Sequence, residues 1–172
     1  MKYKLIAAVS KDGGIGKQGN LPWRVKEDLT FFSRITKGDG NNAVIMGRKT
    51  WNSLGGKHLP GRDNYILSST LDYEKEASGN VIQSFGSITT MEAHIDVRNY
   101  DDVWVIGGSE IYKQYLDSDK VDTCYLTQID QLFECDTFFP SLSRSEWKLA
   151  EVEELHTQQP FKVEVHKLSK II

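Results

Sequence analysis

The segment Val103-Trp104-Val105-Ile106-Gly107-Gly108-Ser109-Glu110-Ile111-Tyr112 joins an apolar, strand-length run to two glycines and then to the start of a helix. Glycines let the backbone approach a ligand closely, and the free N–H groups of a helix start attract anions. A tight turn that needs glycine only for its backbone dihedrals would have the same sequence, so the segment alone leaves both explanations open. In either case, a strand that runs directly into a helix is typical of an α/β fold.

The same alternation continues on both sides of this segment. Strands are expected at 3–10, 43–46, 64–67, 81–83 and 103–106, and helices at 25–37, 49–54, 88–97 and 109–116. After residue 120, strand-like runs at 124–129, 147–153 and 161–168 follow one another without helices, and the last alternates apolar and polar residues as an antiparallel edge strand does. The pattern predicts a single α/β domain over residues 1–172, with a mostly parallel sheet of about eight strands, an antiparallel C-terminal edge and about four flanking helices.

The overall composition excludes several classes of protein. The chain has 172 residues, 39% of them hydrophobic and 26% charged, with a net charge of −3, which argues against general nucleic-acid binding. Its two cysteines, Cys124 and Cys135, have neither metal-ligand nor disulfide-framework spacing, and its four histidines are scattered, so no metal site is expected. No run reaches transmembrane length, and the residues after Met1 enter a strand-length apolar run rather than a signal peptide. We expect a soluble cytoplasmic protein that does not bind membranes.

Two further strand ends carry cations and hydroxyl groups. The run 43–51 ends in Gly47-Arg48-Lys49-Thr50-Trp51, and the strand at 64–67 is followed by Ser68-Ser69-Thr70. Carboxyl ends of parallel strands meet at one edge of a sheet, where ligands of open α/β sheets bind. This edge predicts a site for a multiply phosphorylated nucleotide. Because Arg48 with two serines suits a 2′-phosphate, the pattern favours NADP over NAD.

The run Gly14-Ile15-Gly16-Lys17-Gln18-Gly19 matches the dinucleotide fingerprint G-x-G-x-x-G, but its context does not fit. That fingerprint needs a strand that leads straight into the glycines and a helix that starts on them. Here Lys11-Asp12 follows the strand, and Pro22 stands where the helix should already be running. We therefore expect a flexible glycine loop at the end of the first strand, of the kind that closes over a ligand.

One carboxylate stands out on the first expected helix, in the segment Asn20-Leu21-Pro22-Trp23-Arg24-Val25-Lys26-Glu27-Asp28-Leu29-Thr30-Phe31-Phe32. At about 100° per residue, one face of this helix is apolar. The apolar residues on that face are Val25, Leu29, Phe32 and Ile35. Asp28 falls in the middle of them, whereas Glu27 lies on the opposite, polar side. The position of Asp28 has two explanations. It is either an acid that the helix dipole favours in the first turn or a carboxylate with a function, and these residues alone do not decide between the two.

Together these features resemble one family, dihydrofolate reductase. Seven blocks occur in the family's order and at family-like spacings, over most of the chain. They are Leu5–Ala8, the glycine loop, Asn20–Trp23, Val44–Trp51, Leu59–Arg62, Val105–Tyr112 and Asp136–Pro140. The resemblance implies a dihydrofolate-reductase-like fold and the NADPH-dependent reduction of 7,8-dihydrofolate to 5,6,7,8-tetrahydrofolate, with a hydride to C6 and a proton to N5. This reaction would supply one-carbon metabolism and thymidylate synthesis.

The resemblance also assigns roles in substrate binding. Asp28, at the bacterial-type position, would accept two hydrogen bonds from the 2-amino and N3 edge of the pterin, and Thr127 would hydrogen-bond Asp28. Arg62 would clamp the α-carboxylate of the glutamate tail. The residues implied for catalysis are Leu21, Trp23, Asp28 and Thr127, and those implied for substrate binding are Ile6, Asp28, Phe32, Leu54, Leu59, Arg62, Ile106, Tyr112 and Thr127. Of these, Leu21, Phe32, Leu54 and Leu59 would wall the pocket, and the carbonyls of Ile6 and Ile106 would face the pterin edge.

The cofactor implied is NADPH, and the family's peptide bond at Gly107-Gly108 is cis. The residues implied for the cofactor are Ala8, Ile15, Gly16, Gly19, Asn20, Gly47, Arg48, Lys49, Thr50, Leu67, Ser68, Ser69, Gly107, Gly108, Ser109, Glu110 and Ile111. Antifolate inhibitors are implied as further ligands, and we expect a monomer.

Two segments depart from the family pattern, and three other functions fit the residues less well. Residues 55–58 leave open which residue meets the glutamate tail, and the loop 38–42 is longer than in compact bacterial members. A riboflavin-pathway reductase would leave Asp28 and Arg62 without partners. A non-catalytic binding protein would be signalled by loss of Asp28 or of the Gly107-Gly108 junction, and both are present. A P-loop kinase is excluded because the chain has no G-x-x-x-x-G-K-[ST] string.

Overall fold

A computed structural model describes residues 2–172, and over this range the chain forms four helices and eleven strands. The helices are α1 (Lys26–Lys37), α2 (Arg48–Ser53), α3 (Ile88–Asp96) and α4 (Ser109–Asp117). The strands are β1 (Tyr3–Val9), β2 (Gly14–Gly16), β3 (Asn42–Gly47), β4 (Asp63–Leu67), β5 (Glu74–Ala77), β6 (Asn80–Phe85), β7 (Asp102–Val105), β8 (Val121–Ile129), β9 (Thr137–Phe138), β10 (Trp147–Leu155) and β11 (Val163–Lys170).

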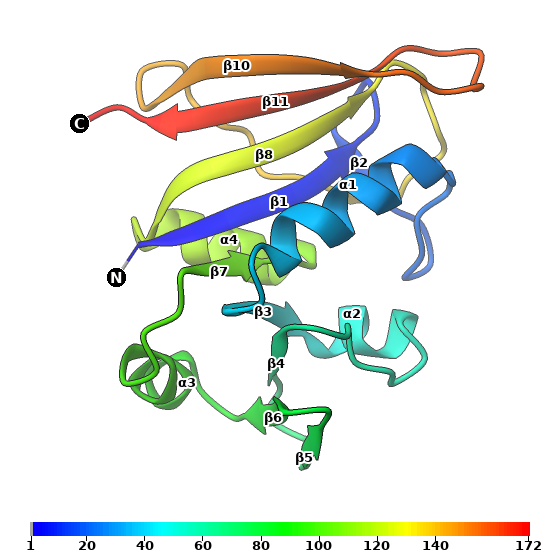
Figure 1. The fold of residues 1–172 in the computed structure, drawn as a ribbon. Helices are drawn as coiled ribbons and strands as arrows, with labels where there is room; N and C mark the ends of the chain where they lie inside the picture. Colours follow the sequence, from blue (N-terminus) through cyan, green and yellow to red (C-terminus); the bar gives the residue numbers. More distant parts are fainter. Residues whose placement is uncertain (1) are drawn as a thin grey trace.

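Nine strands form one sheet in the order β10-β11-β8-β1-β7-β3-β4-β6-β5 (Figure 1). The six strands from β8 to β6 pair in parallel, and antiparallel strands close both edges. The mostly parallel sheet with an antiparallel C-terminal edge agrees with the expected fold. Of the strands in this sheet, the sequence pattern missed β5, whose residues Glu-Lys-Glu-Ala are mostly charged and mostly exposed. Charged side chains of this kind protect a sheet edge from further pairing, so they hide the strand from a hydrophobicity pattern.

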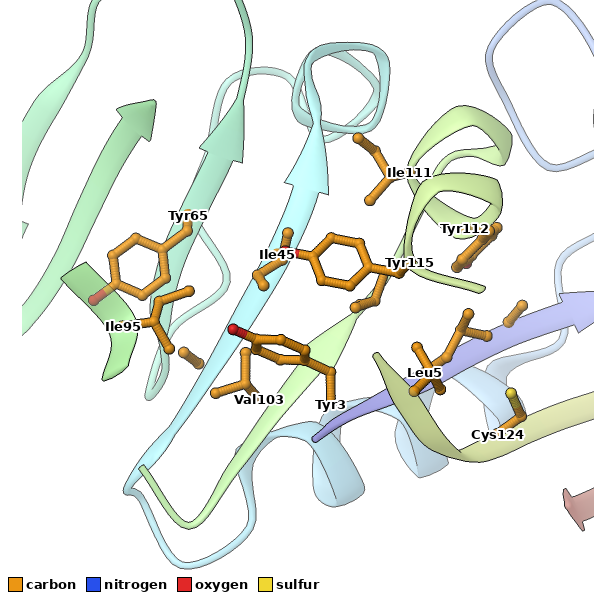
Figure 2. Close-up of a cluster of buried hydrophobic side chains, with 14 of the residues drawn as sticks. Tyr3, Leu5, Ile45, Tyr65, Ile95, Val103, Ile111, Tyr112, Tyr115 and Cys124 are labelled. Carbon is orange, nitrogen blue, oxygen red and sulfur yellow. The ribbon is translucent and has the colours of Figure 1, made fainter. Parts of the chain in front are cut away.

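The two faces of β1 belong to different parts of the core. Leu5 packs into a cluster with residues of α3 and α4, whereas Ile6 packs into a second cluster with Phe31 of α1. Successive side chains of a strand point to opposite faces, so β1 is covered on both sides, as its apolar run predicts. Figure 2 shows the first cluster, in which Tyr3 and Tyr115 meet edge to face with ring centroids 5.2 Å apart.

The buried face of α1 differs from the expected one. Leu29 is 40% exposed, whereas Phe31 is 6% exposed and packs against Tyr125 of β8. Val25 is buried but has an extended backbone and precedes the helix as its N-cap. Because Val25 lies outside the helix, it does not set the direction of the helical face. The prediction of Leu29 in the buried stripe is therefore wrong, whereas Asp28 does lie on the buried face.

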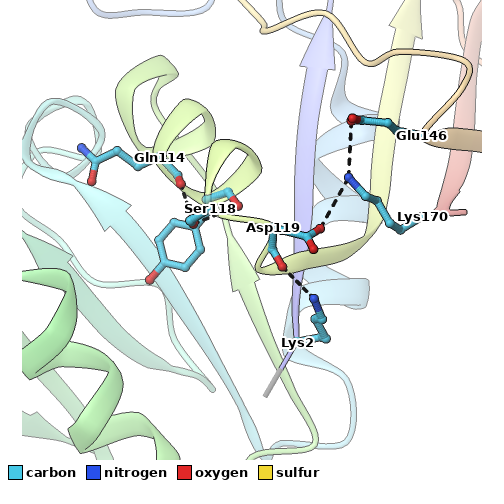
Figure 3. A network of polar contacts seen from close by, with 7 residues as sticks. Lys2, Gln114, Ser118, Asp119, Glu146 and Lys170 are labelled. Carbon is cyan, nitrogen blue, oxygen red and sulfur yellow. Dashed lines mark hydrogen bonds and ion pairs between the residues drawn. The ribbon is translucent and has the colours of Figure 1, made fainter. Parts of the chain in front are cut away.

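A polar network joins three distant segments at the amino end of the parallel strands (Figure 3). The Lys2 ammonium donates to the Asp119 carbonyl oxygen at 2.6 Å, and Lys170 lies 3.5 Å from both the Asp119 and the Glu146 carboxylates. The start of β1, the turn after α4 and the end of β11 are thereby held together. The carboxyl ends of the same parallel strands lie at the opposite edge, which is where the sequence predicts the nucleotide site.

Candidate active site

Asp28 is a buried carboxylate with one hydrogen-bond donor from the protein. Thr127 on β8 pairs in register with Ala8 of β1 and lies two residues after Tyr125, so it shares the sheet face that contacts α1. Its hydroxyl donates to Asp28 Oδ1 at 2.6 Å, and the two residues are 2% and 9% exposed. Burial raises the pKa of Asp28, and the hydrogen bond from Thr127 opposes that shift. Among the described residues, no Lys, Arg or His forms an ion pair with Asp28.

The backbone carbonyl of Ile6, in the middle of β1, and that of Ile106, just after β7, meet at one buried hydroxyl. The Tyr112 hydroxyl, from α4, lies 2.8 Å from the carbonyl oxygen of Ile6 and 2.9 Å from that of Ile106. A phenol carries one proton, so it donates to one of these oxygens at a time or shares its proton between them. The structure thus brings together three residues that the resemblance assigns to substrate binding, two of which it places at the pterin edge. Each carbonyl oxygen also retains a lone pair for another donor.

Arg62 is buried without a carboxylate partner. It is 2% exposed, and its Nε and Nη2 donate to the Pro60 carbonyl oxygen at 2.9 and 2.7 Å. Its Nη1 donates to the Thr36 hydroxyl at the end of α1 at 2.9 Å. Burial lowers the pKa of Arg62, and within the part of the chain described it forms no ion pair. One N–H on each terminal nitrogen stays available, in the fork geometry that suits a carboxylate.

The strand-to-helix junctions after β3 and β7 touch each other. The Gly47 N–H donates to the Gly107 carbonyl oxygen at 2.8 Å, and a Cβ added at Gly47 would lie 3.0 Å from Ile111 Cγ1. The Gly107-Gly108 peptide bond is cis. Neither α2 nor α4 has a side-chain cap at its N-terminus, so the first N–H groups of both helices are free to bind an anion.

The hydroxyl groups after β4 contact the cation that follows β3. The Arg48 guanidinium donates to the Thr70 hydroxyl, and Ser68 Oγ accepts from the N–H of Leu71 at 3.0 Å. Arg48 and Ser69 are exposed at this edge. Thr70 is a contact that the assignment from sequence omitted, although it belongs to the hydroxyl cluster that signalled the site. Its hydrogen bond holds Arg48 beside the two serines.

The glycine loop is more ordered than the sequence suggests. Residues 14–16 form β2, which pairs with β9 in a separate two-stranded sheet. Lys17 forms an ion pair with Glu134, and the N–H of Gln18 donates to Asp136 Oδ2 at 2.9 Å, which lowers the pKa of Asp136. Residues 14–16 of the expected loop therefore form a paired ribbon, and residues 17–20 form the turn that follows it. Sequence reasoning missed Glu134 entirely, because its partner Lys17 is 117 positions away.

The other expected site residues fall into two groups. Phe32, Leu54 and Leu59 are half-buried and pack against the cluster that contains Ile6, whereas Leu21 is 48% exposed and lies outside it. Trp23 is buried against Phe133, with ring centroids 5.2 Å apart. The remaining cofactor candidates lie on strands, in one turn and at two helix starts. On the strands are Ala8 in β1, Ile15 and Gly16 in β2, and Leu67 at the end of β4, while Gly19 and Asn20 are exposed in the turn after β2. At the helix starts are Lys49 and Thr50 in α2, and Ser109 and Glu110 in the first turn of α4.

Within residues 2–172, no group of three or more His, Cys, Asp or Glu side chains is arranged to hold a metal ion. No helix in that range has the length and apolar character needed to cross a membrane.

Comparison with known proteins gives a consistent answer. Residues 2–170 match the family model described as dihydrofolate reductase. The chain is 42% identical over 151 residues to a Haemophilus influenzae dihydrofolate reductase, covering 87% of this chain and 85% of the relative. It is 38% identical over 151 residues to the Drosophila melanogaster enzyme, covering 84% and 82%.

A solved structure agrees over almost the whole chain. The Enterococcus faecalis dihydrofolate reductase, complexed with NADP(H) and RAB-propyl, superposes with a TM-score of 0.79 and is 30% identical. The match covers 98% of this chain and 96% of that structure. The chain therefore belongs to the dihydrofolate reductase family.

Proposed function

We propose that Asp28, Thr127, Arg62 and the carbonyls of Ile6 and Ile106 bind the substrate of the family's reaction. This reaction is the NADPH-dependent reduction of 7,8-dihydrofolate to 5,6,7,8-tetrahydrofolate. The observation that carries the proposal is Asp28, a buried carboxylate that has a single donor and no cation beside it among residues 2–172. Such a group is costly unless a ligand supplies the missing hydrogen bonds. A pterin offers them as a pair of parallel N–H donors from its 2-amino group and N3.

In this mechanism, the protein orients and polarises the substrate. Asp28 holds the pterin by two charge-assisted hydrogen bonds, and Thr127 fixes the direction of the carboxylate. Bound NADPH supplies the hydride that reduces C6, while N5 gains a proton. Asp28 binds the opposite edge of the ring from N5, so we assign proton delivery to solvent and give Asp28 the role of favouring the protonated ring. The half-buried apolar side chains around it exclude water from the two reacting rings.

The residues of the nucleotide edge fit NADPH. Free N–H groups at the starts of α2 and α4 would hold the diphosphate, because neither helix has a side-chain cap at its N-terminus. Arg48 with Ser68 and Ser69 would hold the 2′-phosphate through charge-assisted hydrogen bonds. An NAD-specific site would present an acidic residue to the ribose instead.

Arg62 would bind the α-carboxylate of the glutamate tail. Its guanidinium is buried and lacks a counter-charge within the described chain, so an anion that reached its free N–H groups would relieve that cost. The α-carboxylate of the tail is also the group that distinguishes dihydrofolate from pteridines without a glutamate tail. Antifolate inhibitors that carry a diaminopyrimidine or pteridine head would use the Asp28 end of the site.

We further propose that residues 1–172 form one domain that acts as a cytoplasmic monomer. The single nine-stranded sheet, which joins strands from both ends of the chain, supports one domain. The thiols of Cys124 and Cys135 are free, which suits a reducing compartment. Light scattering of the purified protein would measure its mass, and a stable dimer would contradict the monomer.

The decisive assay follows the loss of NADPH absorbance when dihydrofolate is added. We expect turnover with NADPH and much slower turnover with NADH. The Asp28→Asn variant should lose about 10²–10³ in hydride transfer at neutral pH, the range typical of losing one preorganised electrostatic group. Its activity should recover in part at low pH, where the substrate arrives already protonated.

Glu27→Gln is the matched control, because Glu27 is the adjacent acid on the same helix and lies outside the buried cluster around Asp28. We expect its turnover to change by less than about twofold. Absence of NADPH consumption by the parent enzyme would overturn the proposed function. A crippled Glu27→Gln with a mild Asp28→Asn would overturn the assignment of the carboxylate.

A further inference from the structure

The edge strand β10 has no role in the site described so far. It pairs only with β11, and it forms one end of the large sheet (Figure 1). Seven consecutive residues, Lys148–Glu154, are exposed, so neither face of the strand is covered there. Within residues 2–172, Lys148–Leu155 form no backbone hydrogen bonds other than those to β11. The outward-pointing N–H and C=O groups of this edge are therefore free to pair with another strand.

A groove lies beside β10 on the side of the sheet that faces α1. Its volume is about 400 Å³. Its floor includes Phe31 of α1, Tyr125 of β8 and Val165 of β11, and the centroids of the two rings are 6.3 Å apart. Glu151 and Glu153 of β10 line its outer side. The groove thus combines an aromatic floor with two carboxylates.

The groove already holds one cation of the protein itself. The Lys167 ammonium lies 3.9 Å from a carboxylate oxygen of Glu151 and 5.7 Å from the centroid of the Tyr125 ring. Glu153, in contrast, forms no ion pair within the described part of the chain. Aromatic faces and carboxylates both attract a basic side chain, arginine above all. One carboxylate beside the aromatic floor is therefore left for a cation from outside.

The opposite face of β10 carries two exposed apolar side chains. The pairing with β11 is irregular between Leu149 and Glu151, and this bulge shifts the alternation of faces by one residue. Leu149 and Val152 consequently lie on the same face, and they are 52% and 48% exposed. A strand added beside β10 would therefore meet carboxylates on one face and apolar side chains on the other.

We propose that β10 binds an extended basic segment of a partner protein, which adds to the sheet as a further strand. Backbone hydrogen bonds to the free edge hold the segment, and its alternate side chains give specificity. Its basic side chains lie against Glu151 and Glu153 beside the groove, and its apolar side chains lie beside Leu149 and Val152. This inference does not depend on the proposed function.

The charge of the edge favours a basic partner over a second copy of the chain. The run Lys148–Glu154 contains one lysine and three glutamates. Like charges placed opposite each other on paired strands oppose pairing, whereas opposite charges favour it. A second copy of β10 carries the same excess of glutamates, so its approach is opposed. A segment in which basic and apolar residues alternate has the complementary pattern.

The test uses a fluorescently labelled nine-residue peptide in which arginine alternates with valine, titrated into the enzyme and followed by anisotropy. We expect saturable binding at low ionic strength, weakened in 0.5 M salt because exposed charges are screened. A peptide in which glutamate alternates with valine should not bind. Bound arginine peptide should also slow hydrogen exchange of the amides in Lys148–Leu155, because added backbone hydrogen bonds protect them.

Glu151→Lys/Glu153→Lys reverses the charge beside the groove. We expect this variant to bind the arginine peptide about tenfold or more weakly, because two exposed attractions become repulsions. It should bind the glutamate peptide instead, and this gain also shows that the variant is folded. Glu74→Lys/Glu76→Lys is the matched control, since it makes the same change of charge on β5, the edge strand at the other end of the sheet. It should bind the arginine peptide as the parent does.

Four results would overturn the inference. They are failure of the parent to bind the arginine peptide, equal losses in the two charge-reversal variants, undiminished binding by Glu151→Lys/Glu153→Lys, and unchanged exchange of the β10 amides in the complex. Protection of those amides that grows with protein concentration in the absence of peptide would assign the edge to a second copy of the chain, which also overturns it.

Discussion

Replacing Thr127 by valine removes the one side-chain donor that the described part of the chain gives to Asp28. Valine has nearly the shape of threonine, so the change deletes a hydroxyl without opening a cavity. The lost hydrogen bond is 2.6 Å long, it joins two buried residues, and its acceptor is a carboxylate. Hydrogen bonds to charged groups contribute about 1.5–3 kcal/mol, and we expect the free energy of unfolding at pH 7.5 to fall by that amount.

A double-mutant cycle separates this bond from other effects of the substitution. In the Asp28→Asn background the acceptor is neutral, so Thr127→Val should cost only about 0.5–1.5 kcal/mol. Urea unfolding of the parent, both single variants and the double variant gives the coupling between the two residues. An equal cost of Thr127→Val in both backgrounds would refute the claim that the hydroxyl acts on a buried charge.

The pH dependence of the same series has a definite sign. Burial raises the pKa of Asp28 in the folded protein above its ordinary value of 3.8. In the pH range between 3.8 and the raised pKa, the folded protein therefore binds more protons than the unfolded chain. The contribution of Asp28 to stability therefore falls as pH rises through that range. Asp28→Asn should be more stable than the parent at pH 8, by an amount that shrinks as the pH is lowered toward 3.8. A gap that widened on acidification would contradict the raised pKa.

Three further substitutions test other parts of the site. Arg48→Ala should lower the preference for NADPH over NADH, measured as the ratio of kcat/KM, by about tenfold or more, because a charge-assisted hydrogen bond to the 2′-phosphate is lost. Equal use of both cofactors by the parent would contradict this assignment. Arg62→Leu should weaken dihydrofolate binding by about 2–3 kcal/mol and leave a tail-free pterin unaffected, and equal losses for both would mean that Arg62 acts through the fold. Gly14→Ala should destabilise the protein by about 1–3 kcal/mol, because its Cβ would lie 2.4 Å from Cys135 Sγ; thermal unfolding with no change in Tm would refute that contact.

Sequence reasoning recovered the elements that bury apolar side chains. The runs at β1, β3, β4 and β7 are apolar because helices cover both faces of these strands, so composition marks them directly. The residues of β2, β5 and β9 do not carry that signal. Gly14–Gly16 and Glu74–Ala77 form strands because a partner strand lies beside them, and pairing across the chain leaves no local pattern.

For the candidate site, residue types were easier to predict than their partners. A carboxylate among apolar residues and hydroxyls after a strand are local features, and Asp28 and Ser68 could be singled out on that basis. The hydrogen bond between Thr36 and Arg62 could not be predicted from the sequence. The two residues are 26 positions apart, and their contact depends on how the end of α1 packs. The Leu29 error has the same origin, since the direction of a helical face depends on where the helix begins.

Asp28 and Arg62 carry opposite charges, both are buried, and neither is compensated by the described chain. They do not neutralise each other because α1 holds them apart. Asp28 lies in its first turn, and Arg62 is bound to Thr36 in its last turn, eight residues later. At about 1.5 Å per residue, the two anchoring points are separated by about 12 Å along the helix. A ligand that satisfies both charges must therefore present N–H donors at one end and a carboxylate about that far away. We expect free pterin and free p-aminobenzoyl-glutamate each to satisfy only one of the two charges, and a molecule that joins them to bind far more tightly than either fragment.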